Sequence, residues 1–422
     1  MVRSVKDRRR AVQLAALAAC AAVCAACSSS SGGPSDAKQA SDSGVSAPNP
    51  SSARFSGTYK LMVIGPFSTG GSEESQPEPE IAVGAQAAAA RINAAGGING
   101  KSITIVKCDS QGVPNMATQC AHSAAGQGVL AVVGALDTGG EYLSELQYAG
   151  IPAIAPYAIA EELLNPISYS IFGGVQATAG AISLLKAQEI KDIALVYPDT
   201  PGKPAQMAKL IPAMDSATGA HITGVPIEPD APDLSPVVAE AASHAGIVLF
   251  TNSDLAIAFI HAAQQAGVTR PISSTTGTLT LPAIKSLGSA ADGTNVVDGF
   301  LPASDTSNAG VAAFDRWMNA IDPSATKDDV AENAYSGVEI FADLAKGMTD
   351  VTPQALIQAL NRVSGLTLSL GPVVDFTRNY SNLPGYTRMF DPNVFFDKIE
   401  GGTLVPTSDK PVNAFTGAVV TG

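Results

Sequence analysis

The fold is decided by residues 59–140, which begin YKLMVIGPFSTGG (59–71) and end VVGALDTGG (132–140). Short apolar runs bounded by Gly and Pro predict strands, and longer runs of small apolar residues at helical spacing predict helices. We therefore expect strands at 59–64, 102–107 and 129–134 and helices at 81–95 and 114–126. Strand, helix and strand in this order predict a parallel βαβ arrangement.

Small and polar residues follow two of these strands. The loop after the first strand contains Ser68, and the third strand leads into Asp137-Thr138-Gly139-Gly140. In parallel sheets, ligands bind beyond the carboxyl ends of the strands. We therefore expect the ligand site at these two strand ends.

The same alternation continues along the rest of the chain. A length of 422 residues is too great for one ordinary core, so more than one domain is expected. About ten strand–helix units without a short sequence repeat predict an α/β fold of two doubly wound parallel-sheet lobes. The further expected strands are 151–155, 192–197, 221–227, 247–251 and 271–276, and the further helices are 175–189, 203–217, 235–243, 254–266 and 311–321.

Residues 1–27 have the pattern of a signal peptide for export. A basic head precedes an apolar run at 11–26, which is too short for a comfortable membrane span. Cysteines then follow small residues, as in the lipobox of bacterial lipoproteins, where the cysteine is acylated after cleavage. We expect the lipid on Cys27, with Cys20 as the alternative and a plain secretory signal as a third possibility.

Residues 28–56 consist of Ser, Ala, Pro, Gly and Asp with almost no apolar bulk. Such a segment cannot bury enough surface to become ordered, so we expect a disordered tether. The protein is then expected to be exported and held on the outer face of the cell membrane by its N-terminal lipid.

Two cysteines remain in the body of the chain, Cys108 and Cys120. One remaining pair in an exported chain suggests a disulfide. Cys120 lies on the helix face of Ala117, Ala121 and Ala124, so the bond would join a strand end to its following helix. Two buried free thiols are the alternative.

Charge and motifs argue against several function classes. The formal net charge is −13, and no basic patch follows the N-terminus, which argues against nucleic acid as a partner. The four histidines lack metal-ligand spacing, no Gly-x-Ser-x-Gly motif occurs, and residues 65–71 lack the Gly-Lys-Ser/Thr of a P-loop. We expect no enzymatic activity, no cofactor and no metal.

Several segments together resemble a known family. They are Gly84-Ala85, RINAAGGINGK (91–101), Asp109-Ser110, Val132-Val133-Gly134, Ala266-Gly267 and LGPVVDF (370–376). From about Tyr59 to Phe396 the chain resembles the type I periplasmic binding proteins, most closely the leucine/isoleucine/valine-binding group that serves ABC importers. The Asn-Ala-x-Gly-Gly-Ile-x-Gly segment is the most specific of these motifs.

The resemblance implies two lobes joined by three crossovers, which trap a small-molecule ligand in the cleft between them. Lobe 1 would comprise 57–175 and 302–376, and lobe 2 would comprise 176–301 and 377–422. The permease subunits of an ABC importer are the implied partners, and we expect a monomer. The resemblance also implies a disulfide near Cys108, whose partner in this chain would be Cys120.

In this family a hydroxyl and backbone N–H groups after the third strand hold the carboxylate of the ligand. The corresponding residues are Thr138 and Gly139, where free N–H groups and the helix dipole favour an anion. A Gly-rich helix entry without a ligand is the alternative. Ser68 and Tyr157, in other strand-end loops, are further expected ligand neighbours.

Other positions depart from the pattern of amino-acid binders. Asn252 lies near a position that is often Tyr, and Thr276 replaces the acid that usually faces the ammonium group of the ligand. Asp137, Asp199 or Asp254 could supply the missing charge, or they could be helix caps and solvated loop acids. The leading interpretation is a solute receptor for an amino acid or a related carboxylate or amide. The alternative is a sensor or envelope-interaction lipoprotein on the same fold.

Overall fold

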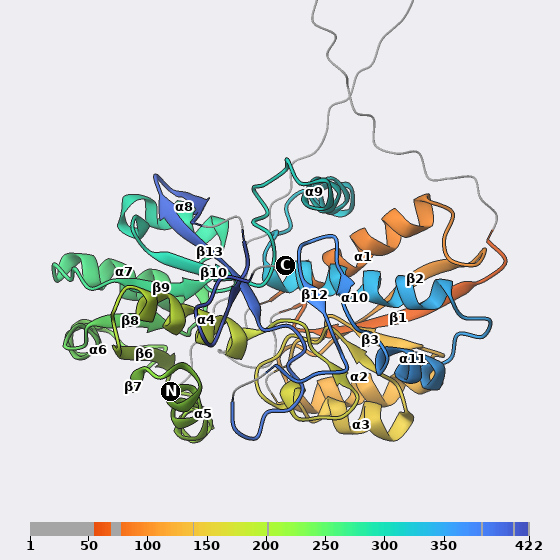
Figure 1. Ribbon diagram of the computed structural model, residues 1–422, viewed down its shortest axis with the longest axis horizontal. Helices are drawn as coiled ribbons and strands as arrows, with labels where there is room; N and C mark the ends of the chain where they lie inside the picture. The colour runs from red at the N-terminus through yellow and green to blue at the C-terminus, as the bar shows by residue number, and fades with distance from the viewer. Residues whose placement is uncertain are drawn as a thin grey trace, which may run out of the picture. The chain divides into compact units, whose positions relative to one another are not determined.

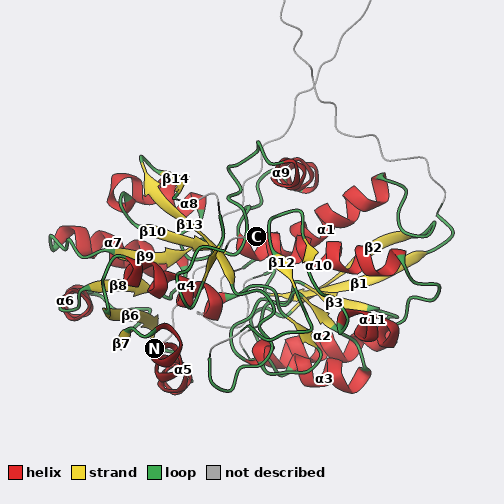
Figure 2. Cartoon of the chain, viewed as in Figure 1, coloured by secondary structure: helices red, strands yellow, loops and turns green. Residues whose placement is uncertain are grey.

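The computed structural model describes residues 55–68, 77–137, 139–200, 202–380, 383–407 and 410–420. Their strands form two large sheets and one two-stranded ribbon (Figures 1 and 2). Cys20, Cys27 and Thr138 lie outside the described residues, so the predictions for them remain predictions.

The first sheet contains the strands of the segment that decides the fold. They are parallel, in the order β2-β1-β3-β4-β5. Successive strand residues face opposite sides, so Leu61 and Val63 enter one core and Met62 and Ile64 enter another. Helices therefore cover both faces, as the βαβ pattern predicts. The strands are β1 (Thr58–Gly65), β2 (Ser102–Asp109), β3 (Ala131–Val133), β4 (Ala153–Ile154) and β5 (Ser168–Tyr169).

Helices α2 (Pro114–Gly126) and α3 (Tyr142–Ala149) cover the face of Met62 and Ile64. The predicted disulfide is present and joins Cys108 to Cys120. Cys108 lies within β2 rather than just past it, because this strand continues two residues beyond its predicted end. The bond holds the strand to the helix that follows it.

The opposite face is covered by α1 (Pro79–Ala94) together with α10 (Asp329–Lys346), and α9 (Ala309–Ile321) also packs on α1. The first two helices lie side by side although they are far apart in sequence (Figure 1). A Cβ atom at Gly84 would lie 2.2 Å from the carbonyl oxygen of Ala331, so only glycine permits this close approach. Helix α11 (Pro353–Leu360) packs beside α10.

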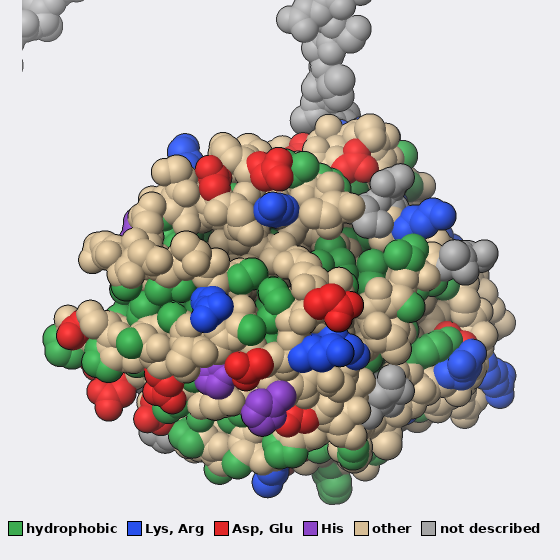
Figure 3. All heavy atoms as spheres, turned by 60° about the vertical axis from the view of Figure 1, so that its left-hand side comes forward, with side chains coloured by type: hydrophobic (Ala, Val, Ile, Leu, Met, Phe, Trp, Pro, Cys, Tyr) green, Lys and Arg blue, Asp and Glu red, His purple; other side chains and the backbone are tan. Residues whose placement is uncertain are grey.

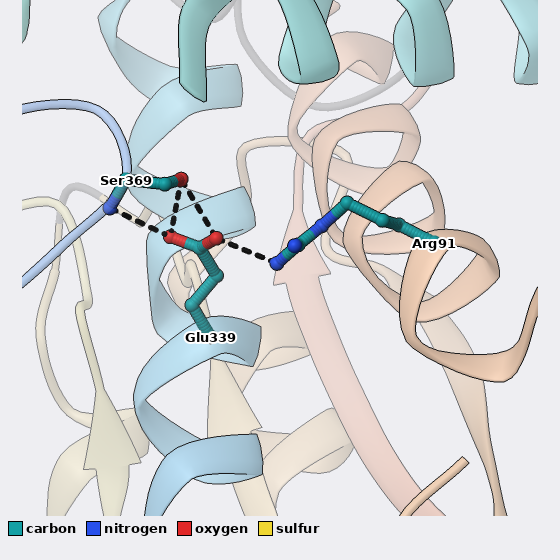
Figure 4. Close-up of polar contacts among 3 residues, drawn as sticks. All are labelled: Arg91, Glu339 and Ser369. Carbon is teal, nitrogen blue, oxygen red and sulfur yellow. Dashed lines mark hydrogen bonds and ion pairs between the residues drawn. The ribbon is translucent and has the colours of Figure 1, made fainter. Parts of the chain in front are cut away.

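A polar network also ties α1 to α10 (Figure 4). Arg91 Nη2 lies 2.6 Å from Glu339 Oε1. The hydroxyl of Ser369 lies 2.7 and 2.8 Å from the two carboxylate oxygens of Glu339, and its backbone N–H donates to one of them at 3.3 Å. Ser369 belongs to the turn between β11 (Leu366–Thr367) and β12 (Val373–Val374), which pair as the antiparallel ribbon.

The second sheet has the order β14-β13-β10-β9-β8-β6-β7, with β15 paired to β13. Strands β10, β9, β8, β6 and β7 run parallel to one another. Strand β13 pairs antiparallel with β10 and with β14. The strands are β6 (Asp192–Pro198), β7 (His221–Ile227), β8 (Gly246–Leu249), β9 (Ile272–Thr275), β10 (Asn295–Asp298), β13 (Asn393–Glu400), β14 (Thr403–Pro406) and β15 (Val412–Asn413).

Both faces of this sheet are covered as well. In β6, Ile193 and Leu195 enter the core of α4 (Gly174–Ala187) and α5 (Lys203–Thr218). Ala194 and Val196 enter the core of α6 (Ser235–Ala242), α7 (Ser253–Gln265) and α8 (Leu281–Leu287). Two short 3₁₀ helices, η1 (Glu161–Leu163) and η2 (Gly288–Ala291), complete the elements.

The chain passes between the two large sheets three times: after β5, after β10 and before β13. This arrangement confirms the predicted α/β fold of two doubly wound sheets. The predicted lobe boundaries remain predictions. No helix in the described ranges is long and apolar enough to cross a membrane.

On the face drawn in Figure 3, Lys and Arg side chains are dispersed among acidic and uncharged ones. That face therefore carries no continuous basic patch, which is the feature that a nucleic-acid interface requires.

Candidate functional site

A pocket of about 520 Å³ opens between helices that belong to both sheets. One side is formed by residues 77–80 at the start of α1 and residues 322–328 before α10. The other side is formed by the start of α7 and by the segment from Gly277 to Ala283. Because α1, α7 and α8 follow β1, β8 and β9, the pocket lies near the carboxyl ends of strands from both sheets.

Three helices begin at this pocket with capping side chains. Asn252 Oδ1 accepts from Leu255 N at 3.0 Å, and Thr280 Oγ1 accepts from Ala283 N at 3.4 Å. Asp328 Oδ1 accepts from the N–H of the residue three positions later, at 3.2 Å. Each cap satisfies an N–H that the first turn of a helix leaves free. The caps thereby fix where α7, α8 and α10 start and which residues reach the pocket.

The pocket wall is acidic. Among the described residues, five with carboxyl groups line it, and no Lys, Arg or His does. Three of the five bring carboxylate oxygens within 4.8 Å of one another: Glu78, Glu80 and Asp328. The other two are Asp254, which is exposed, and Asp322.

Burial and nearby negative charges oppose the ionisation of Asp328 and Glu78. The pKa of Asp328 is well above its usual range, first because of burial and then because of the charges of Glu80 and Asp329. Burial, a hydrogen bond with Glu80 and the neighbouring negative charges likewise raise the pKa of Glu78. A proton or a cation is therefore needed to stabilise the carboxylates at this wall.

A second, smaller cavity adjoins the pocket and shares Thr280 and Asp328 with it. Its volume of about 20 Å³ is enough for roughly one water molecule. Buried Thr276, Asp298 and Asp397 lie in its wall. Neither carboxylate oxygen of Asp397 has a hydrogen-bond partner among the described residues, and burial raises the pKa of this group to about 6.

The first turn of α10 adds two more buried acids. Tyr157 Oη donates to Asp329 Oδ2 at 3.0 Å, and burial raises the pKa of Asp329. Glu332, one turn further, is 1% exposed, and neither of its carboxylate oxygens has a partner within the described part of the chain. Its pKa is raised well above the usual range by burial first and by the charges of Asp298 and Asp329 second. The start of α10 thus concentrates acidic groups between the two sheets.

Some residues predicted from the sequence lie at these cavities. Asp254 lines the pocket, and Thr276 lines the smaller cavity. Tyr157 reaches the same region through its hydrogen bond to Asp329. Asn252 caps α7 immediately before the pocket residue Ser253.

The described predicted residues in the loops after β1 and β3, Ser68, Asp137 and Gly139, line neither cavity. Ser68 donates its hydroxyl to Asp109. Asp137 Oδ2 accepts from the N–H of Gly139 at 3.2 Å, and a Cβ at Gly139 would lie 2.1 Å from a carboxylate oxygen of Glu141. The N–H of Gly139 therefore already has an acidic partner. Anion binding at Thr138 and Gly139 stays a prediction.

The sequence did not reveal the buried acids. A local signal exists only at the start of α10, where Asp328, Asp329 and Glu332 are spaced to lie on neighbouring faces of one helix turn. The buried acids that lack such a signal are Glu80, Asp298 and Asp397, which α1, β10 and β13 bring to this region.

The sequence matches the family model described as "Periplasmic binding protein" over residues 58–386. The chain belongs to this family. It is a family of extracytoplasmic, substrate-binding proteins that take up small molecules and work with the permeases of ABC transporters. No curated protein sequence matches the chain.

Solved structures share the type I fold at low sequence identity. An extracellular ligand-binding receptor from Verminephrobacter eiseniae is 18% identical, with a TM-score of 0.69 over 82% of this chain and 99% of that chain. A possible leucine/isoleucine/valine-binding protein from Rhodopirellula baltica is 15% identical, with a TM-score of 0.68 over 83% and 96%. A fatty acid ABC transporter substrate-binding protein from Thermomonospora curvata is 18% identical, with a TM-score of 0.69 over 86% and 94%. At these identities the likeness shows the fold alone.

Proposed function

We propose that the protein is the solute receptor of an ABC importer. It binds a small polar solute, an amino acid or a related carboxylate or amide, between its two sheets and presents it to the permease subunits. It acts as a monomer on the outer face of the cell membrane, anchored by a lipid on Cys27, with Cys20 as the alternative. Residues 28–56 form the tether.

One observation carries this proposal: the pocket is built by helix starts from both sheets. Its volume of about 520 Å³ is in the range of small-molecule sites. A solute in this position contacts residues 77–80 and 322–328 on one side and α7 and α8 on the other. Such contacts would couple binding to movement of one sheet against the other, which is a signal that permease subunits can read.

A bulky side chain at the pocket rim tests the site. Ser324 lines the pocket, and its hydroxyl donates to Asp322 at 2.6 Å. Ser307 makes the same kind of contact with Asp305, two residues earlier, and lines neither cavity. Both serines are exposed. Ser324→Trp and Ser307→Trp are therefore a matched pair.

The full chain is screened by thermal shift against amino acids, amides, small carboxylates and amines, and hits are measured by calorimetry. A solute at 100 times its Kd stabilises the folded state by about 2.7 kcal/mol. We expect Ser324→Trp to abolish the shift and Ser307→Trp to retain it. A hit that both variants bind equally would place the site elsewhere, and the absence of any hit would argue against the receptor function.

A further inference from the structure

We propose that the solute of this pocket is an organic cation, an alkyl compound with two or more amino groups. The carboxylates of the pocket and of the adjoining cavity hold these groups. This inference rests on the proposed receptor function and names the chemical class of its ligand.

The first argument is the charge of the lining side chains. Glu78, Glu80, Asp322 and Asp328 line the pocket, and its described lining residues include no Lys, Arg or His. The adjoining cavity adds Asp298 and Asp397, and the lysine in its described wall, Lys327, pairs with Asp315. A ligand carboxylate would add a further negative charge beside these acids, whereas an ammonium group offers each carboxylate a charged hydrogen-bond donor.

The second argument is independent of the number of acids. Asp397 is 0% exposed, and neither of its carboxylate oxygens has a hydrogen-bond partner among the described residues. Asp397 lies in the wall of the cavity that adjoins the pocket. Unpartnered buried polar groups are costly and rare in native proteins. A cationic group delivered through the pocket supplies the missing partner.

The third argument separates an organic amine from a metal ion. The trio of Glu78, Glu80 and Asp328 could hold a metal ion by itself. The pocket, however, is far larger than one ion needs, and its wall contains aliphatic Ile257, prolines and alanines as well as the acids. Ammonium groups joined by methylene carbons match a wall that contains both acidic and apolar side chains.

The experiment uses the full chain and three probes of equal length: putrescine, 1,4-butanediol and succinate. Spermidine extends the series, and calcium chloride tests for an inorganic cation. We expect putrescine and spermidine to raise the Tm and to give a calorimetric isotherm. The diol, the diacid and calcium should do neither at the same concentrations.

Asp328→Asn is the decisive variant, because asparagine keeps the helix cap and the shape but removes the charge. Loss of one charged hydrogen bond should weaken amine binding about tenfold or more. Asp305→Asn removes an equal charge from an exposed turn that lines neither cavity, and it should bind within twofold of the parent. Glu80→Gln replaces the first variant if Asp328→Asn does not fold.

The outcomes separate this inference from the receptor proposal. Binding of a neutral or anionic solute that Ser324→Trp abolishes would overturn the cationic ligand and leave the receptor standing. Calcium binding without amine binding would also overturn it, as would amine binding that neither Asp328→Asn nor Glu80→Gln weakens. If no solute of any charge binds, both proposals fail.

Discussion

Glu339 uses both of its carboxylate oxygens to join three separate parts of the chain. Its partners are Arg91 on α1 and the hydroxyl and N–H of Ser369. The side chain of Glu339 is only 11% exposed, so water replaces these partners poorly. Such a contact contributes more than an exposed ion pair does.

We therefore expect Glu339→Ala to lower the free energy of unfolding by about 1.5 to 3 kcal/mol, measured by urea denaturation. Glu145→Ala is the control, because the contact of Glu145 with His122 is exposed and 3.4 Å long. Its loss should cost about 1 kcal/mol or less. Equal effects of the two substitutions would contradict the role assigned to Glu339.

Glu162 is a buried acid outside the candidate site. Its Oε1 accepts from Tyr142 Oη at 3.2 Å, and its Oε2 accepts from the N–H groups of Ile159 and Ala160. Burial raises its pKa to about 7 in spite of these hydrogen bonds, which lower it. The folded state holds the proton of Glu162 more tightly than the unfolded state does. The stabilisation that this proton gives the folded state is therefore fully present below about pH 4.5 and is lost as the pH rises through about 7.

The free energy of unfolding should therefore fall between about pH 4.5 and pH 7. Glu162→Gln cannot ionise, so it should flatten this fall by up to about 1.4 kcal/mol per pH unit. The measurement is a series of urea melts across this range. Glu161→Gln, which changes the exposed neighbouring residue, should keep the parent slope. A parent slope in Glu162→Gln as well would rule out Glu162 as a source of the pH dependence.

At the scale of elements, the close approach of α1 and α10 depends on one glycine. Alanine normally favours a helix over glycine by about 1 kcal/mol. At position 84 the added Cβ would lie 2.2 Å from a backbone oxygen of Ala331, so the helices would have to separate. The packing cost should exceed the gain in helix propensity.

Gly84→Ala is thus expected to lower the Tm, and Gly126→Ala, at the end of α2, should raise it slightly or leave it unchanged. A Cβ at Gly126 meets no atom within 4 Å. Thermal unfolding followed by circular dichroism distinguishes the two. A Tm for Gly84→Ala at or above that of the parent would mean that α1 and α10 do not touch at this point.

The disulfide acts between two elements, β2 and α2. Cys108 and Cys120 are 12 positions apart, and a loop of this length gains about 3 kcal/mol in the chain-entropy account. Replacing both cysteines by alanine should lower the free energy of unfolding by about that amount. Reductant should destabilise the parent and leave the double variant unchanged. A parent that is insensitive to reductant would show that the bond contributes little.

At the scale of the whole molecule, ligand binding should draw the two sheets together, because the pocket is lined by helix starts from both. Small-angle X-ray scattering of the full chain should show a smaller radius of gyration with a ligand identified by calorimetry. Ser324→Trp with the same ligand is the control and should show no change. An unchanged radius in the parent with bound ligand would indicate a rigid receptor.

The sequence by itself was sufficient for the local elements and for their order. The periodicity of apolar residues predicted β7 at its observed bounds and the other elements with predicted bounds within a few residues, because facing a core imposes a local repeat. No bounds were predicted for α8, β10, α10, α11 or β13. Spacing also placed Cys120 on the buried face of α2. Alternating strands and helices were then enough to predict two doubly wound sheets.

Only the tertiary structure identified β5 as a strand and showed that the strand predicted at 151–155 is reduced to the two residues of β4, since so short a segment has no period of its own. It alone assembled the acidic pocket, because Glu80, Asp328 and Asp397 belong to separate elements of both sheets. Burial and the proximity of like charges depend on contacts between distant residues, and no local pattern encodes them. The sequence therefore predicted a site at the carboxyl ends of the strands, near which the pocket lies, whereas the charge of the pocket followed only from the packing of the two sheets.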